Sequence, residues 1–132
     1  MNDEVRRWLK KAMEDFRVVV HEMALAPEER VAPAICFHAQ QFVEKVFKAF
    51  LVLHGKEFPR THNLSFLREL CGEVEADFRE LPVGELSLYA VEMRYPGESA
   101  EITADDALAC FEKATQVKRF IERKLGIRLE EL

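Results

Sequence analysis

Hydrophobic residues recur at steps of three and four along most of the chain, which is the spacing of amphipathic helices. The first segment with this pattern runs from about residue 3 to residue 25. Asn2 or Asp3 can cap its start, and Pro27 marks its end. The pattern therefore predicts one long helix, whose apolar face consists of Val5, Trp8, Leu9, Ala12, Phe16, Val19, Val20 and Met23.

The segment from about Pro33 to His54 shows the strongest helical pattern, and Gly55 follows it as a C-terminal stop. One arc of this helix is apolar and consists of Ile35, Ala39, Phe42, Val43, Val46, Phe47, Phe50 and Leu53. The opposite side is polar and carries His38, Gln41, Glu44, Lys45 and Lys48. Phe37 falls among these polar residues. It is either part of a second contact surface, such as a contact with a partner subunit, or a single exposed apolar residue.

Two shorter helices are expected after a polar loop at residues 56–61. Asn63 can cap the first, which ends at Gly72 and buries Leu64, Phe66, Leu67 and Leu70. Residues 73–82 can form a further helical turn. The second short helix is expected at residues 84–93, because Pro96 and Gly97 break the pattern there.

A last long helix is expected between Thr103 and Gly126. Asp106 lies three residues after Thr103, and this spacing approximates a capping box. The apolar face predicted for this helix consists of Leu108, Phe111, Ala114, Val117, Ile121 and Leu125.

No segment alternates with a period of two, and no internal repeat is visible. Short loops between successive helices favour antiparallel neighbours. With 132 residues, 48% of them hydrophobic, the chain can bury a core of its own. The sequence therefore predicts an all-α fold, an up-and-down antiparallel bundle of four to five helices, formed by residues 1–132 as a single domain.

Composition and charge narrow the function classes. The net charge is −5, with 19 basic and 24 acidic residues, which argues against broad nucleic-acid binding. The longest run without Asp, Glu, Lys or Arg is 13 residues, residues 31–43, too short for the roughly 20 that a membrane span needs. Charged residues open the chain where a signal peptide would be apolar, so we expect a cytoplasmic protein with no membrane contact. The three cysteines form no C-x-x-C pair, and neither a metal site nor a cofactor is expected.

Common catalytic motifs are absent from the sequence, but two local clusters could bind an anion. The first is Arg60-Thr61-His62-Asn63-Leu64, where a helix N-terminus offers unpaired amides. The second is Arg94-Tyr95-Pro96, where the arginine can bind phosphate and the tyrosine can stack on a base. The alternative for Arg94 is a favourable charge at a helix C-terminus, with Tyr95 only packing.

Residues 36–51, CFHAQQFVEKVFKAFL, resemble the C-F-x-A-Q-Q-A-x-E-K-x-x-K-A-x-L helix of HEPN (higher eukaryotes and prokaryotes nucleotide-binding) domains. Three further features agree in order along the chain. They are Trp8-Leu9 with Ala12 and Asp15, then His62-Asn63-Leu64, and then Arg94-Tyr95-Pro96. The resemblance covers roughly residues 5 to 125.

The resemblance implies a helical bundle, frequent homodimers and nucleotide binding. It also implies a pairing with a small nucleotidyltransferase, often as a toxin–antitoxin module. Family members of that kind are commonly metal-independent ribonucleases with an R-x(4–6)-H motif. This sequence has no arginine followed by histidine at that spacing: three residues separate Arg17 from His21, and seven separate Arg30 from His38. We therefore expect no catalytic residues and a binding module rather than an enzyme.

The expected ligand is a nucleotide or a nucleotide-bearing substrate. Its expected contacts are Arg94 with phosphate, Tyr95 with the base, and His62 with Lys45 or Lys48 as further positive charge. The expected interface residues are Phe37, Gln41 and Glu44. Two alternatives stay open: a toxin ribonuclease with an atypical site, such as Arg94 with His62, and a purely structural protein-interaction domain.

Overall fold

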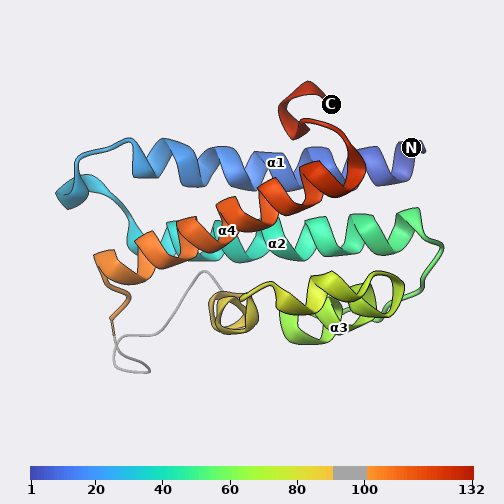
Figure 1. Ribbon diagram of the computed structural model, residues 1–132. Helices are drawn as coiled ribbons and strands as arrows, with labels where there is room; N and C mark the ends of the chain where they lie inside the picture. The colour runs from blue at the N-terminus through green and yellow to red at the C-terminus, as the bar shows by residue number, and fades with distance from the viewer. Residues whose placement is uncertain (91–100) are drawn as a thin grey trace.

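The computed structural model describes residues 1–90 and 101–132, and these residues form an all-α helical bundle (Figure 1). Within these residues, four α-helices carry the fold: α1 (Asp3–Met23), α2 (Ala32–Leu53), α3 (Leu64–Val74) and α4 (Ala104–Leu125). Four short 3-10 helices connect or extend them: η1 (Pro27–Glu29), η2 (Ala76–Glu80), η3 (Gly84–Tyr89) and η4 (Leu129–Glu131). No strand occurs within these described ranges, and the predicted fold class is confirmed.

Helix α2 lies at the centre of the bundle. Helix α1 runs antiparallel beside it, α4 crosses the pair obliquely, and α3 lies along the C-terminal half of α2 (Figure 1). The chain after α4 turns back so that η4 contacts α1. Because α2 contacts α1, α3, η3 and α4, its residues are buried on more than one side.

Aromatic rings join α2 to its neighbours in the core. The Phe16 and Phe42 ring centroids lie 5.0 Å apart between α1 and α2. Phe78 of η2 packs against Phe50 at 4.3 Å and against Phe47 at 6.0 Å. Offset and edge-on ring pairs of this kind add to the free energy of hydrophobic burial. The short η2 turn is therefore anchored in the core by a single phenylalanine.

The predicted helix caps are present. Asn2 and Asn63 accept hydrogen bonds from the backbone amides of Val5 and Phe66, respectively. At the start of α4, the Thr103 hydroxyl accepts from the Asp106 amide at 3.1 Å, and the Asp106 carboxylate accepts from the Thr103 amide at 2.8 Å. These two bonds make a complete capping box. Gly126 ends α4 with φ of 66°, a conformation that favours glycine.

The prediction that Val20, Phe66 and Leu108 lie on buried apolar faces is wrong. Val20, Phe66 and Leu108 are exposed by 41%, 43% and 45%, respectively. Helix α4 instead buries the face that contains Ala107 and Cys110, and Leu108 is turned about 100° from Ala107 on the helix. The helical spacing alone allowed both choices, and packing against α2 selects the face with the small residues.

The second short helix also differs from its prediction. Residues 84–89 form a 3-10 helix rather than an α-helix. The remainder of the predicted 84–93 segment lies, from residue 91 onward, outside the described residues.

The capping box makes a stability prediction. Thr103→Ala removes the oxygen that accepts from the Asp106 amide, and we expect the free energy of unfolding to fall by about 1 kcal/mol. Thr103→Ser keeps the hydroxyl and should retain most of the stability. Urea denaturation followed by circular dichroism measures both variants. Equal losses in both would show that the threonine methyl group, rather than the cap, carries the effect.

Candidate functional site

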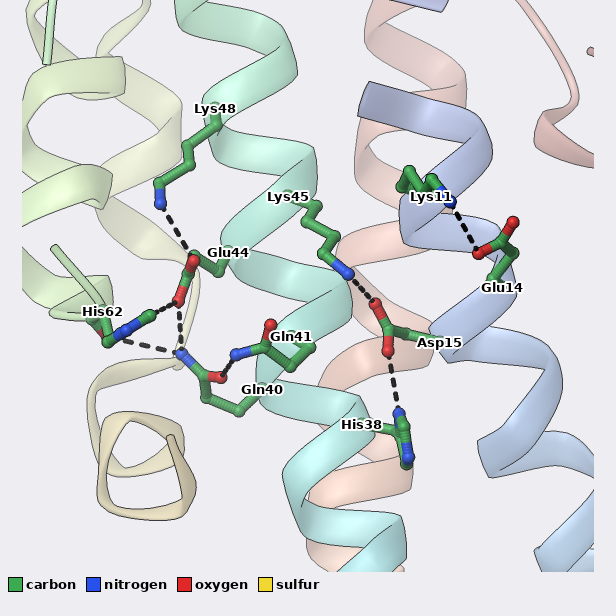
Figure 2. Close-up of polar contacts among 10 residues, drawn as sticks. All are labelled: Lys11, Glu14, Asp15, His38, Gln40, Gln41, Glu44, Lys45, Lys48 and His62. Atoms are coloured by element: carbon green, nitrogen blue, oxygen red, sulfur yellow. Dashed lines mark hydrogen bonds and ion pairs between the residues drawn. The ribbon is translucent and has the colours of Figure 1, made fainter. Parts of the chain in front are cut away.

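Two buried carboxylates organise the polar side of α2. The first is Asp15 of α1, which is 7% exposed. Its Oδ1 accepts from Nδ1 of His38 at 2.8 Å, and its Oδ2 accepts from Nζ of Lys45 at 2.7 Å (Figure 2). One aspartate of α1 thus holds two side chains that lie two turns apart on α2.

The second carboxylate is Glu44 of α2, which is 4% exposed. Its Oε1 accepts from Nδ1 of His62 at 2.8 Å and from Nε2 of Gln40 at 3.0 Å, and its Oε2 accepts from Nζ of Lys48 at 2.9 Å (Figure 2). Gln41 extends the network by donating to Oε1 of Gln40 at 2.6 Å. Glu44 therefore ties α2 to the loop that precedes α3.

Glu44 is ionised despite its burial. Removal from water raises its pKa, but hydrogen bonds from Lys48, Gln40 and His62 together outweigh this effect and leave the pKa below its usual value. The carboxylate is thus compensated by three donors, as a buried charge requires.

The polar side of α2 is not the open surface that the helical pattern suggests. Lys48 is 8% exposed, and its ammonium lies 5.8 Å from the Trp8 ring centroid and 5.9 Å from that of Phe58. Glu44 and Lys48 are bonded to each other beneath this cover. Gln41, Lys45 and Phe37 are partly exposed, and the Phe37 ring lies edge-on to His38 at 5.0 Å.

The start of α3 differs from the open anion site that the sequence suggests. The Leu64 amide donates to Oγ of Ser87 at 2.7 Å, and the Phe66 amide donates to the Asn63 cap at 3.1 Å. The Asn63 amide is bonded to Oγ1 of Thr61. The expectation of unpaired amides here is therefore wrong for these three groups. His62 itself keeps an exposed imidazole, with 66% of the side chain accessible.

A shallow cavity of about 430 Å³, widely open to solvent, lies beside the Asp15 network, between α1 and α2. Its lining consists of Glu4, Arg7, Trp8, Lys11 and Lys45. Of these five residues, the sequence pattern predicts only Lys45 as a site residue, and it places Trp8 on the apolar face of the first helix. The available signal was the spacing of Glu4, Arg7, Trp8 and Lys11, which places all four on one face of α1.

Three of the five residues that line the cavity are basic and one is a carboxylate, although much of the surface that they present is apolar. Lys45 is paired with Asp15, and Lys11 lies 3.6 Å from Glu14 in an exposed pair. No hydrogen bond or ion pair links the Arg7 guanidinium to the part of the chain that the structure describes. Exposed ion pairs contribute little free energy, so Lys11 can exchange Glu14 for an anionic ligand at small cost.

Two predicted contacts cannot be placed in this site: Arg94 and Tyr95 lie outside the described residues. Among the described residues, no three His, Cys, Asp or Glu side chains gather as a metal ion would require. No described helix combines the length and apolar character needed to cross a membrane.

The fold and site define a class of protein: an all-α bundle whose central helix carries buried ion pairs beside a cavity lined by Trp8 and three basic residues. The family model for the HEPN domain matches residues 5–124, and the chain belongs to this family. Membership confirms the resemblance seen at residues 36–51 and places the chain among nucleotide-binding or ribonuclease-type modules. No curated protein and no solved structure matches the chain significantly.

The Glu44 network predicts a pH-dependent contribution to stability. Glu44→Gln leaves the Lys48 ammonium without its buried partner, and we expect a loss of roughly 3 kcal/mol at neutral pH. Because folding lowers the pKa of Glu44, the wild-type carboxylate stabilises the protein above its usual value of 4.5, and this contribution is lost as the pH falls through the folded-state pKa. The stability difference between wild type and variant should therefore shrink in acid.

Denaturant unfolding at pH 7 and pH 4 measures this difference. Glu14→Gln is the matched control, because it removes a carboxylate from an exposed pair and should change stability little. A Glu44→Gln loss that is equal at both pH values would contradict an ionic role for Glu44.

Proposed function

We propose that this protein is a non-catalytic HEPN module that binds a nucleotide in the cavity beside Trp8. The observation that carries the proposal is the lining of that cavity, which combines the indole ring of Trp8 with Arg7, Lys11 and Lys45. In the proposed complex the basic side chains contact phosphate and the base stacks on Trp8.

The chemistry of these side chains supports the proposal. A guanidinium can bind two phosphate oxygens in parallel, and an ammonium adds positive charge. Stacking of a base on an aromatic ring contributes about 1–3 kcal/mol and tolerates any base. The volume of about 430 Å³ falls within the range of ligand sites.

Binding without catalysis is favoured by the sequence. The family's ribonucleases use an R-x(4–6)-H motif, and the chain has no arginine and histidine at this spacing. A general base must reach the proton that it removes, and no histidine follows His62 in the sequence.

The other predicted contacts have separate places in the proposal. Arg94 and Tyr95 remain predicted phosphate and base contacts. Lys48 supports the site from beneath, because its ammonium lies against Trp8. His62, whose Nδ1 is bonded to Glu44, has an exposed imidazole and remains a predicted source of positive charge for the ligand.

We further propose that the module forms a homodimer and presents its nucleotide to a small nucleotidyltransferase partner, as in toxin–antitoxin pairs. A binding module without catalytic groups needs a second protein to act on its ligand. Family membership supports this arrangement, and Phe37 and Gln41 on the partly exposed side of α2 are its proposed contact residues. Glu44, the third residue predicted at the interface, is not among them, because its carboxylate is buried and bonded within the chain.

Trp8 provides a direct test of the nucleotide site, because it is the only tryptophan in the chain. A bound base should change its fluorescence, and nucleoside mono-, di- and triphosphates can be titrated in turn. Arg7→Met should weaken binding about tenfold, through loss of a charged hydrogen bond. Arg7 is a cleaner target than Lys45, whose removal also breaks the pair with Asp15.

Arg6→Met is the matched control for this titration. Arg6 is also exposed on α1 and carries the same charge, but it does not line the cavity. A nucleotide that leaves Trp8 fluorescence unchanged, or equal affinities in the two variants, would contradict the proposed site.

The proposed dimer is tested by Phe37→Lys. A charged side chain in a packed interface is costly, so we expect the mass in solution to fall to that of a single 15.3 kDa chain. Light scattering after size exclusion measures it. Phe66→Lys, at an exposed phenylalanine on α3, should leave the dimer intact. A dimer that survives Phe37→Lys would remove this surface from the interface.

A further inference from the structure

A second cavity lies next to the first, and Glu4 belongs to both. This second cavity, of about 460 Å³, is lined by Glu4, Val52, Gly55, Lys56, Glu57 and Phe58. The Trp8 and Phe58 rings contact each other edge to face, with centroids 6.4 Å apart. Trp8 lines one cavity and Phe58 lines the other, so this ring pair and Glu4 form the boundary between them.

The two cavities differ in charge. The first has three cations and one carboxylate. The second has the carboxylates of Glu4 and Glu57 and a single cation, Lys56, which is itself paired with Glu73 at 3.4 Å. Lys45 and Lys11 of the first cavity are also paired, with Asp15 and Glu14, so this cavity is close to neutral while the second is negative. A phosphate group therefore favours the first cavity over the second.

Glu4 is free to bind a ligand. No hydrogen bond or ion pair joins its carboxylate to the described part of the chain, although it stands between two cavities. An ionised carboxylate only accepts hydrogen bonds, so its ligand partner must be a donor. Sugar hydroxyls and the amino groups of bases are donors of this kind.

We infer that Glu4 determines specificity and that the ligand is a nucleoside monophosphate. Its one phosphate group lies among Arg7, Lys11 and Lys45, and its sugar or base donates to Glu4 at the boundary with the second cavity. This inference rests on the proposed nucleotide site and names its ligand class. A triphosphate carries more negative charge than the first cavity compensates, because two of its three cations, Lys11 and Lys45, already have the carboxylate partners Glu14 and Asp15.

The test compares ligands that share a phosphate but differ in donors. Isothermal titration calorimetry measures the affinity of wild type and of Glu4→Gln for each ligand. The ligands are inorganic phosphate, ribose 5-phosphate, the four ribonucleoside monophosphates and the four triphosphates. At least one monophosphate should bind more tightly than its triphosphate. Glu4→Gln should weaken that monophosphate about tenfold and change the affinity for inorganic phosphate less than twofold.

Asp3→Asn is the matched control. Asp3 and Glu4 are both acidic residues of the first turn of α1, where each interacts with the helix dipole, but Asp3 lines neither cavity. A general effect of charge or helix stability would appear in both variants. An effect of ligand contact appears in Glu4→Gln alone.

The outcomes separate this inference from the proposed function. A wild-type protein that binds none of the nucleotides would overturn both. Nucleotide binding that is equal in Glu4→Gln and Asp3→Asn would overturn the role of Glu4 and leave the nucleotide site standing. Tighter binding of phosphate and nucleotide together in Glu4→Gln would show that the carboxylate only repels anions. A triphosphate that binds more tightly than its monophosphate would overturn the assignment of the ligand as a nucleoside monophosphate.

Discussion

The ionised carboxylate of Glu44 is the constraint on which the arrangement around α2 depends. A charge with 4% exposure is costly unless donors replace the lost water. Lys48, Gln40 and His62 supply those donors, and together they keep the pKa of the carboxylate below its usual value. Each donor is thereby fixed in place. His62 holds the loop before α3, while Lys48 is held beneath Trp8 and Phe58.

Asp15 performs the same task on the α1 side. It joins His38 and Lys45 of α2 to α1, next to the contact between Phe16 and Phe42. Hydrophobic packing supplies most of the free energy that holds two such helices together, but it is not directional. The ion pairs add direction, because their donors and acceptors must meet at defined distances. They set how α1 lies along α2, and hence how Arg7 and Lys11 lie relative to Lys45.

The sequence was sufficient for the helices and their caps because those features depend on neighbouring residues. Thr103 and Asp106, for example, form their capping box within four positions of the chain. The burial of Glu44 could not be predicted in the same way. The helical pattern places it on the polar side of α2, but its environment depends on His62, 18 positions later, and on the cover over Lys48.

The same limit explains why one cavity residue was found and the others were not. Lys45 belongs to a recognisable helix segment, whereas Glu4, Arg7 and Lys11 read as the ordinary charged side of a surface helix. What distinguishes them from an ordinary surface is Trp8, which lies on the same face and is only partly buried. An aromatic residue at the edge of an apolar stripe, with basic residues one turn away, was the available signal. This signal indicates a cavity only once the fold places Lys45 of α2 opposite these residues of α1.

The overall charge of the chain and the local charge of its cavity favour different ligands. A net charge of −5 repels a long polyanion, whose binding depends on many phosphate contacts spread over a surface. Three cations gathered around one cavity act over a much shorter range, because salt screens charges beyond about 8–10 Å. A small anion that enters the cavity meets those cations at contact distance. Only Glu4, Glu14 and Asp15 lie equally close, and the more remote acidic residues are largely screened. This combination supports a small phosphorylated ligand over a nucleic-acid strand.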